Sequence, residues 1–346
     1  MKRLWQALLI LAIACLTMST KAEFEIHFLD VSQGDAAIVL CDGESMLIDG
    51  GPSSKSDYLY SYIRNHLQLT HLEYIISTHP HEDHAGGIPA ALNAVPVDLI
   101  LSPVLAYDSK TFTSLLRYAD AQGTPIIVPS EGDTLSLGSA VVTIVHCWPE
   151  AWGENDMSIV VRIDYGSVSA LFTGDAEEMS EYIMIDSGFP LQSNILKVGH
   201  HGSASSTTAE FLKAVNPQYA VISCGSQNEY GHPNQSVLDL LQKNGVQTYR
   251  TDLMGTVIAR VQGDKISIAT DRSEGSDDIF RAPGVLLRKE QAEQTSRYII
   301  NMKTRKYHIP SCEYARKIST ENRKEYIGMP GFLIEHGYTP CRFCCR

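Results

Sequence analysis

The chain has 346 residues, and 28 Lys and Arg stand against 40 Asp and Glu, which gives a formal net charge of −12. This length exceeds that of most single domains and leaves room for a large core plus an appendage. Residues 1–280 contain 15 basic and 34 acidic residues, whereas residues 281–346 contain 13 and 6, so the balances are −19 and +7. The acidic body argues against polyanion binding by its charge alone, and the basic tail predicts a second unit with a different partner.

The first 22 residues have the layout of a secretion signal. Lys2 and Arg3 precede an apolar run that ends near Leu16, and small and polar residues lead to a predicted cleavage site after Ala22. The stretch before Cys15 loosely matches a lipoprotein signal, so a lipid anchor at Cys15 is the less favoured alternative. No later run is apolar enough to cross a bilayer. We therefore expect a secreted or cell-envelope protein without a stable transmembrane span.

Residues 23–270 alternate strand-like and helix-like patterns, which predicts a layered α/β domain. The predicted strands are at 25–31, 36–42, 45–51, 72–78, 98–103, 125–129, 141–148, 158–166, 170–175, 194–201 and 219–225. The predicted helices are at 55–67, 110–123, 177–186, 207–215 and 235–245. The last helix ends at Gly245, a residue that suits a left-handed stop. A polar stretch then begins a predicted linker over residues 271–297.

The densest group of metal-ligand residues is THPHEDHAGG, residues 78–87. It follows an apolar run and therefore lies in a loop at the carboxyl end of a strand, where α/β proteins commonly carry their chemistry. Alternation along an extended chain puts His79 and His81 on the same side. Asp83 and His84 then fall near the start of a helix. Three imidazoles and a carboxylate this close together predict a bound cation.

Three separated motifs resemble the metal-binding signature of the metallo-β-lactamase fold. They are THPHEDHAGG at 78–87, ALFTGDAEE at 170–178 and NILKVGHHGSASS at 194–206. With FLDVSQGDAAIV at 28–39 and NEYGHPNQSVLDLL at 228–241, they are similar to the hydrolase domain of ComEC-type competence proteins, and the likeness covers residues 24–270. The resemblance implies a four-layer αββα sandwich, a metal centre at one sheet edge, and hydrolytic chemistry.

The resemblance further implies two zinc ions, with manganese as an alternative, held by six residues of these motifs. They are His79 and His81 for the first ion, Asp83, His84 and His201 for the second, and Asp175 as a bridge. A bridging carboxylate keeps two cations close enough to share a water, which becomes hydroxide near neutral pH. Asp83, one of the ligands of the second ion, is also expected to be a catalytic residue. Since His200 and His201 are neighbours, we expect only one of them to face the metals. The spacing from Asp175 favours His201 over His200, and the other histidine would then support the site.

The sequence departs from the superfamily pattern at the first ion. In GENDMSIVV the usual third histidine is replaced by Asn155, a weak ligand or a support, and His146 is the alternative ligand, although we interpret it as a strand histidine. Asp30 is expected to orient metal ligands. His232 is expected to contact a phosphate or protonate a leaving group, unless it is a loop histidine stacked on the nearby tyrosine. Lys197 is expected to clamp an anion, unless it is a solvated lysine at a strand end.

The tail contains four of the eight cysteines of the chain. His308 and Cys312 are four residues apart, and Cys341 and Cys344 form a Cys-x-x-Cys pair. Two such pairs predict one closed, tetrahedral structural zinc site, with the adjacent final cysteine as a spare and a disulfide module as the alternative. Residues 298–346 resemble an Ada-type metal-binding domain, with His308 where that family has cysteine. The positive balance of the tail implies binding to a nucleic-acid backbone.

These observations predict an exported, metal-dependent hydrolase of phosphodiester bonds, acting on DNA or another nucleic acid through a metal-activated water. One alternative is a hydrolase of small phosphodiesters, such as phosphorylcholine esters on surface polymers. The other is a metal-dependent binding protein without catalysis, because the first metal site lacks one ligand. The sequence alone leaves substrate, metal identity, cleavage polarity and oligomeric state open.

Overall fold

The computed structural model of the protein describes residues 24–226, 228–272, 279–283, 296–328, 333 and 337–344. The predicted signal segment with Cys15, most of the predicted linker, and Cys345 lie outside these ranges. Within them, no helix combines the length and the apolar character that crossing a bilayer requires.

The first sheet of the body has eight strands, and its core-facing residues are almost entirely apolar. In spatial order they are β15 (Lys265–Thr270), β14 (Val257–Gln262), β1 (Phe24–Phe28), β2 (Ala36–Cys41), β3 (Glu44–Gly50), β4 (Leu72–Ile76), β5 (Val97–Leu101) and β6 (Ile126–Ile127). Strands β15 to β3 pair antiparallel, and β3 to β6 pair parallel. The parallel part therefore directs the carboxyl ends of β3 and β4 to the same edge.

The second sheet of the body has seven strands and packs against the first. In spatial order they are β13 (Gln247–Arg250), β12 (Tyr219–Ile222), β11 (Ile195–Lys197), β10 (Val168–Phe172), β9 (Val160–Tyr165), β8 (Ala140–His146) and β7 (Thr134–Leu137). Strands β10 to β13 pair parallel. Their inward side chains, with those of the first sheet, form one apolar layer that includes the stacked pair Phe28 and Phe172. This sheet-on-sheet packing is the centre of the sandwich.

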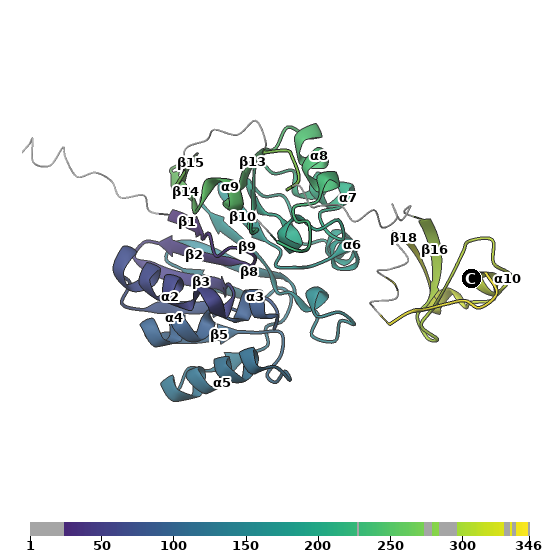
Figure 1. Ribbon diagram of the computed structural model, residues 1–346, viewed down its shortest axis with the longest axis horizontal. Coiled ribbons are helices and arrows are strands. Elements are labelled where there is room, and N and C mark those ends of the chain that lie inside the picture. Colours follow the sequence, from purple (N-terminus) through teal and green to yellow (C-terminus); the bar gives the residue numbers. More distant parts are fainter. Residues whose placement is uncertain are drawn as a thin grey trace, which may run out of the picture.

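Helices cover the outer face of each sheet, as Figure 1 shows. The first sheet carries α2 (Ser56–Ser61), α3 (Glu82–Ala85), α4 (Ile88–Ala94) and α5 (Lys110–Gln122), and the second carries α6 (Glu178–Ser187), α7 (Ala209–Val215), α8 (Gln235–Lys243) and α9 (Thr251–Met254). The predicted αββα fold class is thus confirmed. Gly123 and Gly245 have φ of +75° and +68°, so glycine permits the chain reversals after α5 and α8. Helix α4 was not predicted.

The described part of the tail forms a small four-stranded sheet with the order β18-β16-β17-β19. Its elements are β16 (Ser296–Asn301), β17 (Lys306–His308), α10 (Glu313–Arg316), β18 (Arg323–Gly328) and β19 (Thr339–Pro340). A small core of tyrosines and aliphatic residues contacts Trp152 and Met179 of the body. The Tyr338 ring meets Trp152 edge to face at 5.5 Å, and Arg305 lies over the same indole at 5.3 Å.

Residues 279–283, which we predicted to lie in the linker, contact the body. Arg250 donates to the carbonyl oxygens of Ile279 and Arg281, and Phe280 packs against the core under α8. Arg250 is itself buried and pairs with Asp252 at 2.7 Å. The charge of Asp252 and the two carbonyl acceptors together satisfy this guanidinium, which anchors the segment after the body.

Candidate metal centre

The predicted ligand residues meet at one edge of the sandwich. His79, His81 and His84 follow β4, Asp175 follows β10, and His201 follows β11 in the short helical turn η4 (Gly199–Gly202). These strands belong to the parallel parts of the two sheets, so their carboxyl ends lie on the same side. The fold thus brings the histidine loop after β4 to Asp175 and His201, which follow His84 by 91 and 117 positions in the sequence.

Four of the residues form a compact group. His84 Nε2 lies 3.3 Å from His201 Nε2 and 3.2 Å from Asp175 Oδ1, and His201 Nε2 lies 3.3 Å from Asp83 Oδ2 and 3.6 Å from Asp175 Oδ2. All are buried except Asp83, whose side chain is 31% exposed. Ligands bonded at about 2.0–2.2 Å to one tetrahedral ion lie roughly 3.3–3.6 Å from each other. The group therefore has the spacing of a ligand set with one side open to solvent.

The second group contains the other two predicted ligands. His79 Nε2 lies 3.0 Å from His81 Nδ1 and 3.8 Å from Asp175 Oδ2. Asp175 therefore lies between the two groups, with Oδ1 near His84 and Oδ2 near both His201 and His79. Within each group two imidazole nitrogens approach to 3.3 Å or less, which requires either a proton or a cation between them. Imidazole and carboxylate donors in this arrangement suit divalent ions such as zinc, so the residues fit the metal centre that the sequence predicted.

Asp49, a strand-end aspartate to which we assigned no role from the sequence, holds one of these histidines in place. It lies at the end of β3 and accepts hydrogen bonds from the Thr78 backbone N–H at 2.8 Å and the Thr78 hydroxyl at 2.7 Å. Its Oδ2 is 2.8 Å from His84 Nδ1. A proton on Nδ1 leaves the lone pair on Nε2 of His84, the nitrogen that faces Asp175, available to bind a metal ion. The clue in the sequence is an aspartate at the end of a strand that neighbours the histidine loop.

Lys197 is buried in an ion pair, which corrects both the prediction of an anion clamp and its alternative, a solvated lysine at a strand end. Its side chain is 4% exposed, its Nζ lies 2.7 Å from Asp35 Oδ2, and it also donates to the backbone carbonyl of Val198. Asp35 Oδ1 is 3.1 Å from His201 Nδ1, which donates to the Ser223 carbonyl at 3.0 Å. Burial would raise the pKa of Asp35, but the charges of Lys197 and His201 outweigh it and lower the pKa. Lys197 is therefore the counter-charge of a supporting carboxylate.

Asp30 is also placed differently from the prediction. Its carboxylate accepts a hydrogen bond from Arg272 at 2.9 Å and caps the Ser32 backbone N–H. The supporting role that we expected of Asp30 is occupied by Asp35, five residues later in the same loop. Both aspartates belong to the FLDVSQGDA motif, and the sequence could not show which of them turns inward.

His200 turns toward the centre as well as His201, which corrects the prediction that only one of them does so. Both have left-handed backbone angles, with φ of +46° and +54°, and this conformation lets consecutive side chains face the same way. His200 Nε2 lies 3.6 Å from Asp175 Oδ2, the same distance as His201 Nε2. Its Nδ1 lies 3.1 Å from Glu177 Oε1.

Asn155 lies beside this histidine at the start of the turn η3 (Asn155–Met157). Its amide donates to Glu177 Oε1 at 3.2 Å, and Ser205 donates to the same oxygen at 2.8 Å. The side-chain oxygen Oδ1 of Asn155 is buried and has no hydrogen-bond partner among the described residues. His146, the alternative ligand, instead contacts Glu131 at 2.8 Å and Ser180 at 3.2 Å, as expected of a strand histidine.

His232 lies at the mouth of the centre. Its ring is 5.3 Å from that of His200 and stacks on Tyr230 at 5.7 Å. Burial, followed by the charges of His200 and His201, lowers the pKa of His232 to about 4. The ring is therefore neutral near pH 7, which favours hydrogen bonding to a substrate over proton donation from an imidazolium.

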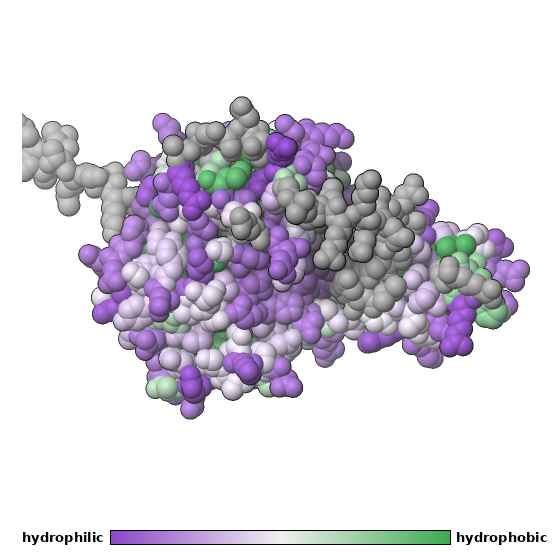
Figure 2. Space-filling view, in the orientation of Figure 1, coloured by the Kyte–Doolittle hydropathy of each residue, from purple (hydrophilic) through white to green (hydrophobic). Residues whose placement is uncertain are grey.

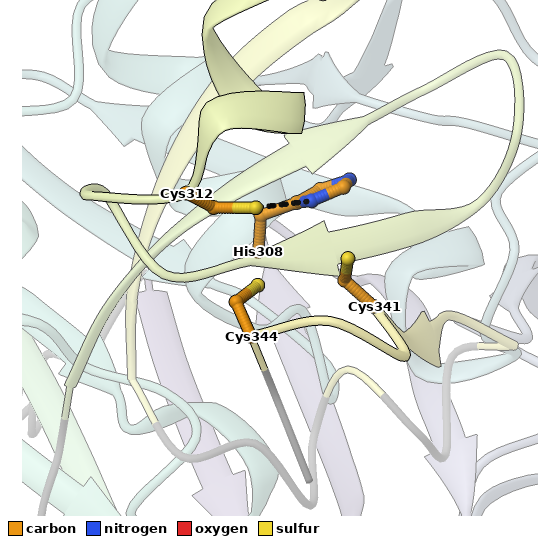
Figure 3. Close-up of side chains that lie close together, drawn as sticks. All are labelled: His308, Cys312, Cys341 and Cys344. Carbon is orange, nitrogen blue, oxygen red and sulfur yellow. Dashed lines mark hydrogen bonds between the residues drawn. The ribbon is translucent and has the colours of Figure 1, made fainter.

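The tail brings its four predicted zinc ligands together, as Figure 3 shows. Ligand atoms of His308, Cys312, Cys341 and Cys344 lie within 4.8 Å of one another, and Cys312 Sγ is 3.4 Å from His308 Nδ1. All six described cysteines are free thiols. Desolvation opposes the Cys312 thiolate, but backbone N–H groups of α10 and the two neighbouring cysteines outweigh it and lower the pKa of Cys312. One imidazole and three thiols at this spacing suit a closed zinc site.

Comparisons with known proteins identify a family and several relatives of this chain. Residues 29–226 match the Metallo-beta-lactamase superfamily. ComE operon protein 3 of Bacillus subtilis is 29% identical over 68% of this chain and 33% of its own length. Recombination protein 2 of Haemophilus influenzae is 30% identical over 77% of this chain and 32% of its own length. The solved structure of CmlA, a diiron beta-hydroxylase from Streptomyces venezuelae, is 16% identical with a TM-score of 0.49 and covers 70% of this chain and 55% of that one.

The chain thus spans about a third of the length of the curated relatives that it matches. The family match ends at residue 226, so the Ada-type resemblance of the tail stays a prediction. The matched region contains every body residue of the two ligand groups. With the αββα sandwich and the converging His and Asp side chains, it establishes that the chain belongs to the metallo-beta-lactamase superfamily.

Proposed function

We propose that this protein is an exported metal-dependent hydrolase that cleaves phosphodiester bonds in nucleic acid. The observation that carries the proposal is the pair of ligand groups that share Asp175. A single shared carboxylate is what two cations need in order to act on the same substrate group. When bound, such ions supply a hydroxide nucleophile near neutral pH and stabilise the charge that develops on a phosphoryl oxygen.

The residues of the chain itself prepare this chemistry. Asp49, Asp35 and the Ser223 carbonyl fix His84 and His201 with Nε2 toward Asp175, so little reorganisation is needed when an ion binds. Asp83, the one solvent-exposed member of the compact group, lies on the side from which a substrate arrives. His232 is neutral and its neighbour His200 is partly exposed, so both are placed to hydrogen-bond a phosphoryl oxygen.

A nucleic-acid substrate is supported by two features outside the centre. The relative named Recombination protein 2 has a name that points to DNA. Residues 281–346 also carry 13 basic and 6 acidic residues, a charge that suits a phosphate backbone. We propose that residues 298–346 form a zinc-stapled domain that delivers the acidic body to the polymer. The acidic body alone favours the second candidate, a hydrolase of small phosphodiesters.

Turnover by the full-length protein tests the proposal on three substrates. They are single-stranded DNA, bis-p-nitrophenyl phosphate and p-nitrophenyl phosphorylcholine. We expect hydrolysis of the first two, complete loss in Asp175→Ala, and no loss in Asp98→Ala, a matched carboxylate on the exposed face of β5. Turnover of the phosphorylcholine ester without DNA cleavage would favour the second candidate. No turnover of any substrate with both ions bound would leave only a binding protein.

A further inference from the structure

Two aromatic rings lie stacked on the surface of the tail. Tyr314 is 44% exposed and Phe343 is 71% exposed. Their ring centroids are 4.6 Å apart with planes 22° from parallel, and the Lys317 ammonium lies 5.4 Å from the Tyr314 centroid. Single exposed apolar residues are common, but a stacked pair with a cation beside it presents a flat π face to solvent, here mainly that of Phe343, the more exposed ring.

The ligand cluster of the tail holds these rings together. Tyr314 lies in α10, two residues after Cys312, and Phe343 lies between Cys341 and Cys344. Each ring therefore projects from one of the two ligand-bearing turns that Figure 3 shows converging. Cys312, Cys341 and Ala315 in these turns are buried, and Cys344 is partly buried. An ion that closes the cluster would fix the two turns relative to one another, and with them the stack.

The charge around the stack is positive. Arg316, Lys317 and Arg342 belong to the same two turns and are exposed, whereas Glu313 is the one acidic residue within them. Residues 296–346 contain ten Lys and Arg against four Glu. Figure 2 shows strongly hydrophilic residues next to apolar ones on the surface of the tail. A partner that fits must therefore offer both negative charge and flat rings.

We propose that Tyr314 and Phe343 form a base-stacking platform for single-stranded nucleic acid. A single strand exposes base faces beside its phosphates, and aromatic platforms within basic grooves bind such strands with little sequence preference. A duplex hides its base faces and offers the platform only phosphates. The proposal rests on the proposed function in one respect, namely that the polymer is a nucleic acid. What it adds is a preference of the tail for single strands, which positive charge alone would not produce.

Fluorescence anisotropy of a labelled 20-mer of thymidine tests the platform, with full-length Asp175→Ala protein so that the strand is not cleaved. Phe343→Ala and Tyr314→Ala should each weaken binding about tenfold, since stacking on one ring supplies about that factor. Tyr314→Phe should keep wild-type affinity. Ile327→Ala, which removes a side chain 56% exposed on the same small domain, should change nothing.

Duplex DNA and heparin serve as polyanions without accessible bases. We expect both to bind equally to Phe343→Ala and to the parent protein. Equal loss of affinity for heparin and for the single strand would overturn the proposal, as would unchanged single-strand affinity in Phe343→Ala. A variant whose zinc content equals that of the parent protein has a folded tail. If Phe343→Ala loses zinc, Phe343→Leu replaces it, because leucine keeps the apolar bulk but has no π face. The Phe343→Ala variant that keeps Asp175 should still hydrolyse bis-p-nitrophenyl phosphate, and this activity reports separately on the proposed function.

Discussion

The body and the tail each gather metal-ligand residues, but they do so in different ways. In the body, the ligands come from loops after three strands and lie above an apolar layer built from fifteen strands. In the tail, the ligands come from two short turns, and among the described residues six buried tyrosine and aliphatic side chains form the core that contacts the body. The body can therefore fold around its polar site, whereas the tail is too small to rely on its core.

The supporting residues differ in the same way. In the body, buried carboxylates and a buried lysine hold the histidines, namely Asp49, Asp35, Glu177 and Lys197. In the tail, backbone N–H groups and neighbouring thiols are the main contacts of Cys312. A site with preformed support suits chemistry, because its ligands are already oriented when an ion binds. A site without it suits a structural ion, whose binding energy stabilises the fold.

Removal of metal should separate the two regions most clearly. We expect a chelator, or Cys341→Ser, to unfold the tail, because binding of structural zinc contributes about 10–16 kcal/mol in small zinc-dependent units. The body should keep its structure under the same conditions. Limited proteolysis with mapped cleavage sites measures this, and rapid cutting within residues 296–344 should leave the sandwich intact. Equal protection of the tail with and without metal would contradict the comparison.

Lys197→Met tests whether the buried lysine is the counter-charge of Asp35. We expect a loss of about 3–5 kcal/mol in the free energy of unfolding of the body, because the buried Asp35 carboxylate would lose its lysine counter-charge and keep only His201 beside it. Lys213→Met, which removes an exposed lysine from α7, should stay within about 0.5 kcal/mol of the parent. Urea unfolding followed by circular dichroism gives both values. Equal stability of the two variants would show that Lys197 carries no such charge role.

Asp49→Asn tests whether the support of the body site acts on metal affinity more than on folding. The amide keeps the size of the side chain but removes the charge that orients His84. We expect metal affinity of the body to fall by about 10–100-fold, as for other ligand-orienting carboxylates. Isothermal titration with zinc, on protein whose tail site carries Cys341→Ser, measures the change. Undiminished affinity would mean that Asp49 serves the fold alone.

Trp152→Ala tests the contact between the two regions and should have the smallest effect. The indole packs against Tyr338 and lies under Arg305, and such aromatic contacts contribute about 0.5–1.5 kcal/mol. Hydrogen exchange at residues 337–340 should accelerate by roughly two- to tenfold on this basis. Tyr182→Ala, on an exposed position of α6, is the matched aromatic control. The same exchange rate in both variants would show that Trp152 does not fix the tail.

The alternating pattern of the sequence predicted a layered α/β domain, and the resemblance of three separated motifs implied the αββα fold and the six body ligands. The histidine cluster at 78–84 and the Cys-x-x-Cys pair can be recognised within a few residues. Helix α4 was missed because IPAALNA is short and has no strong polar face. The role of Lys197 was missed because its partner, Asp35, is 162 positions away and only the pairing of the two sheets brings them together. The inward turn of both His200 and His201 depends on backbone angles that a sequence pattern does not specify.

The central claim is that the body binds two ions that share Asp175 and the tail binds one. Elemental analysis of the purified full-length protein tests it most directly. We predict about three equivalents of divalent metal per chain, about two in Cys341→Ser, and about one in Asp175→Ala, since a bridging ligand serves both body sites. A parent protein with about one equivalent that is lost in Cys341→Ser and unaffected by Asp175→Ala would show that the body holds no metal, and would contradict the account.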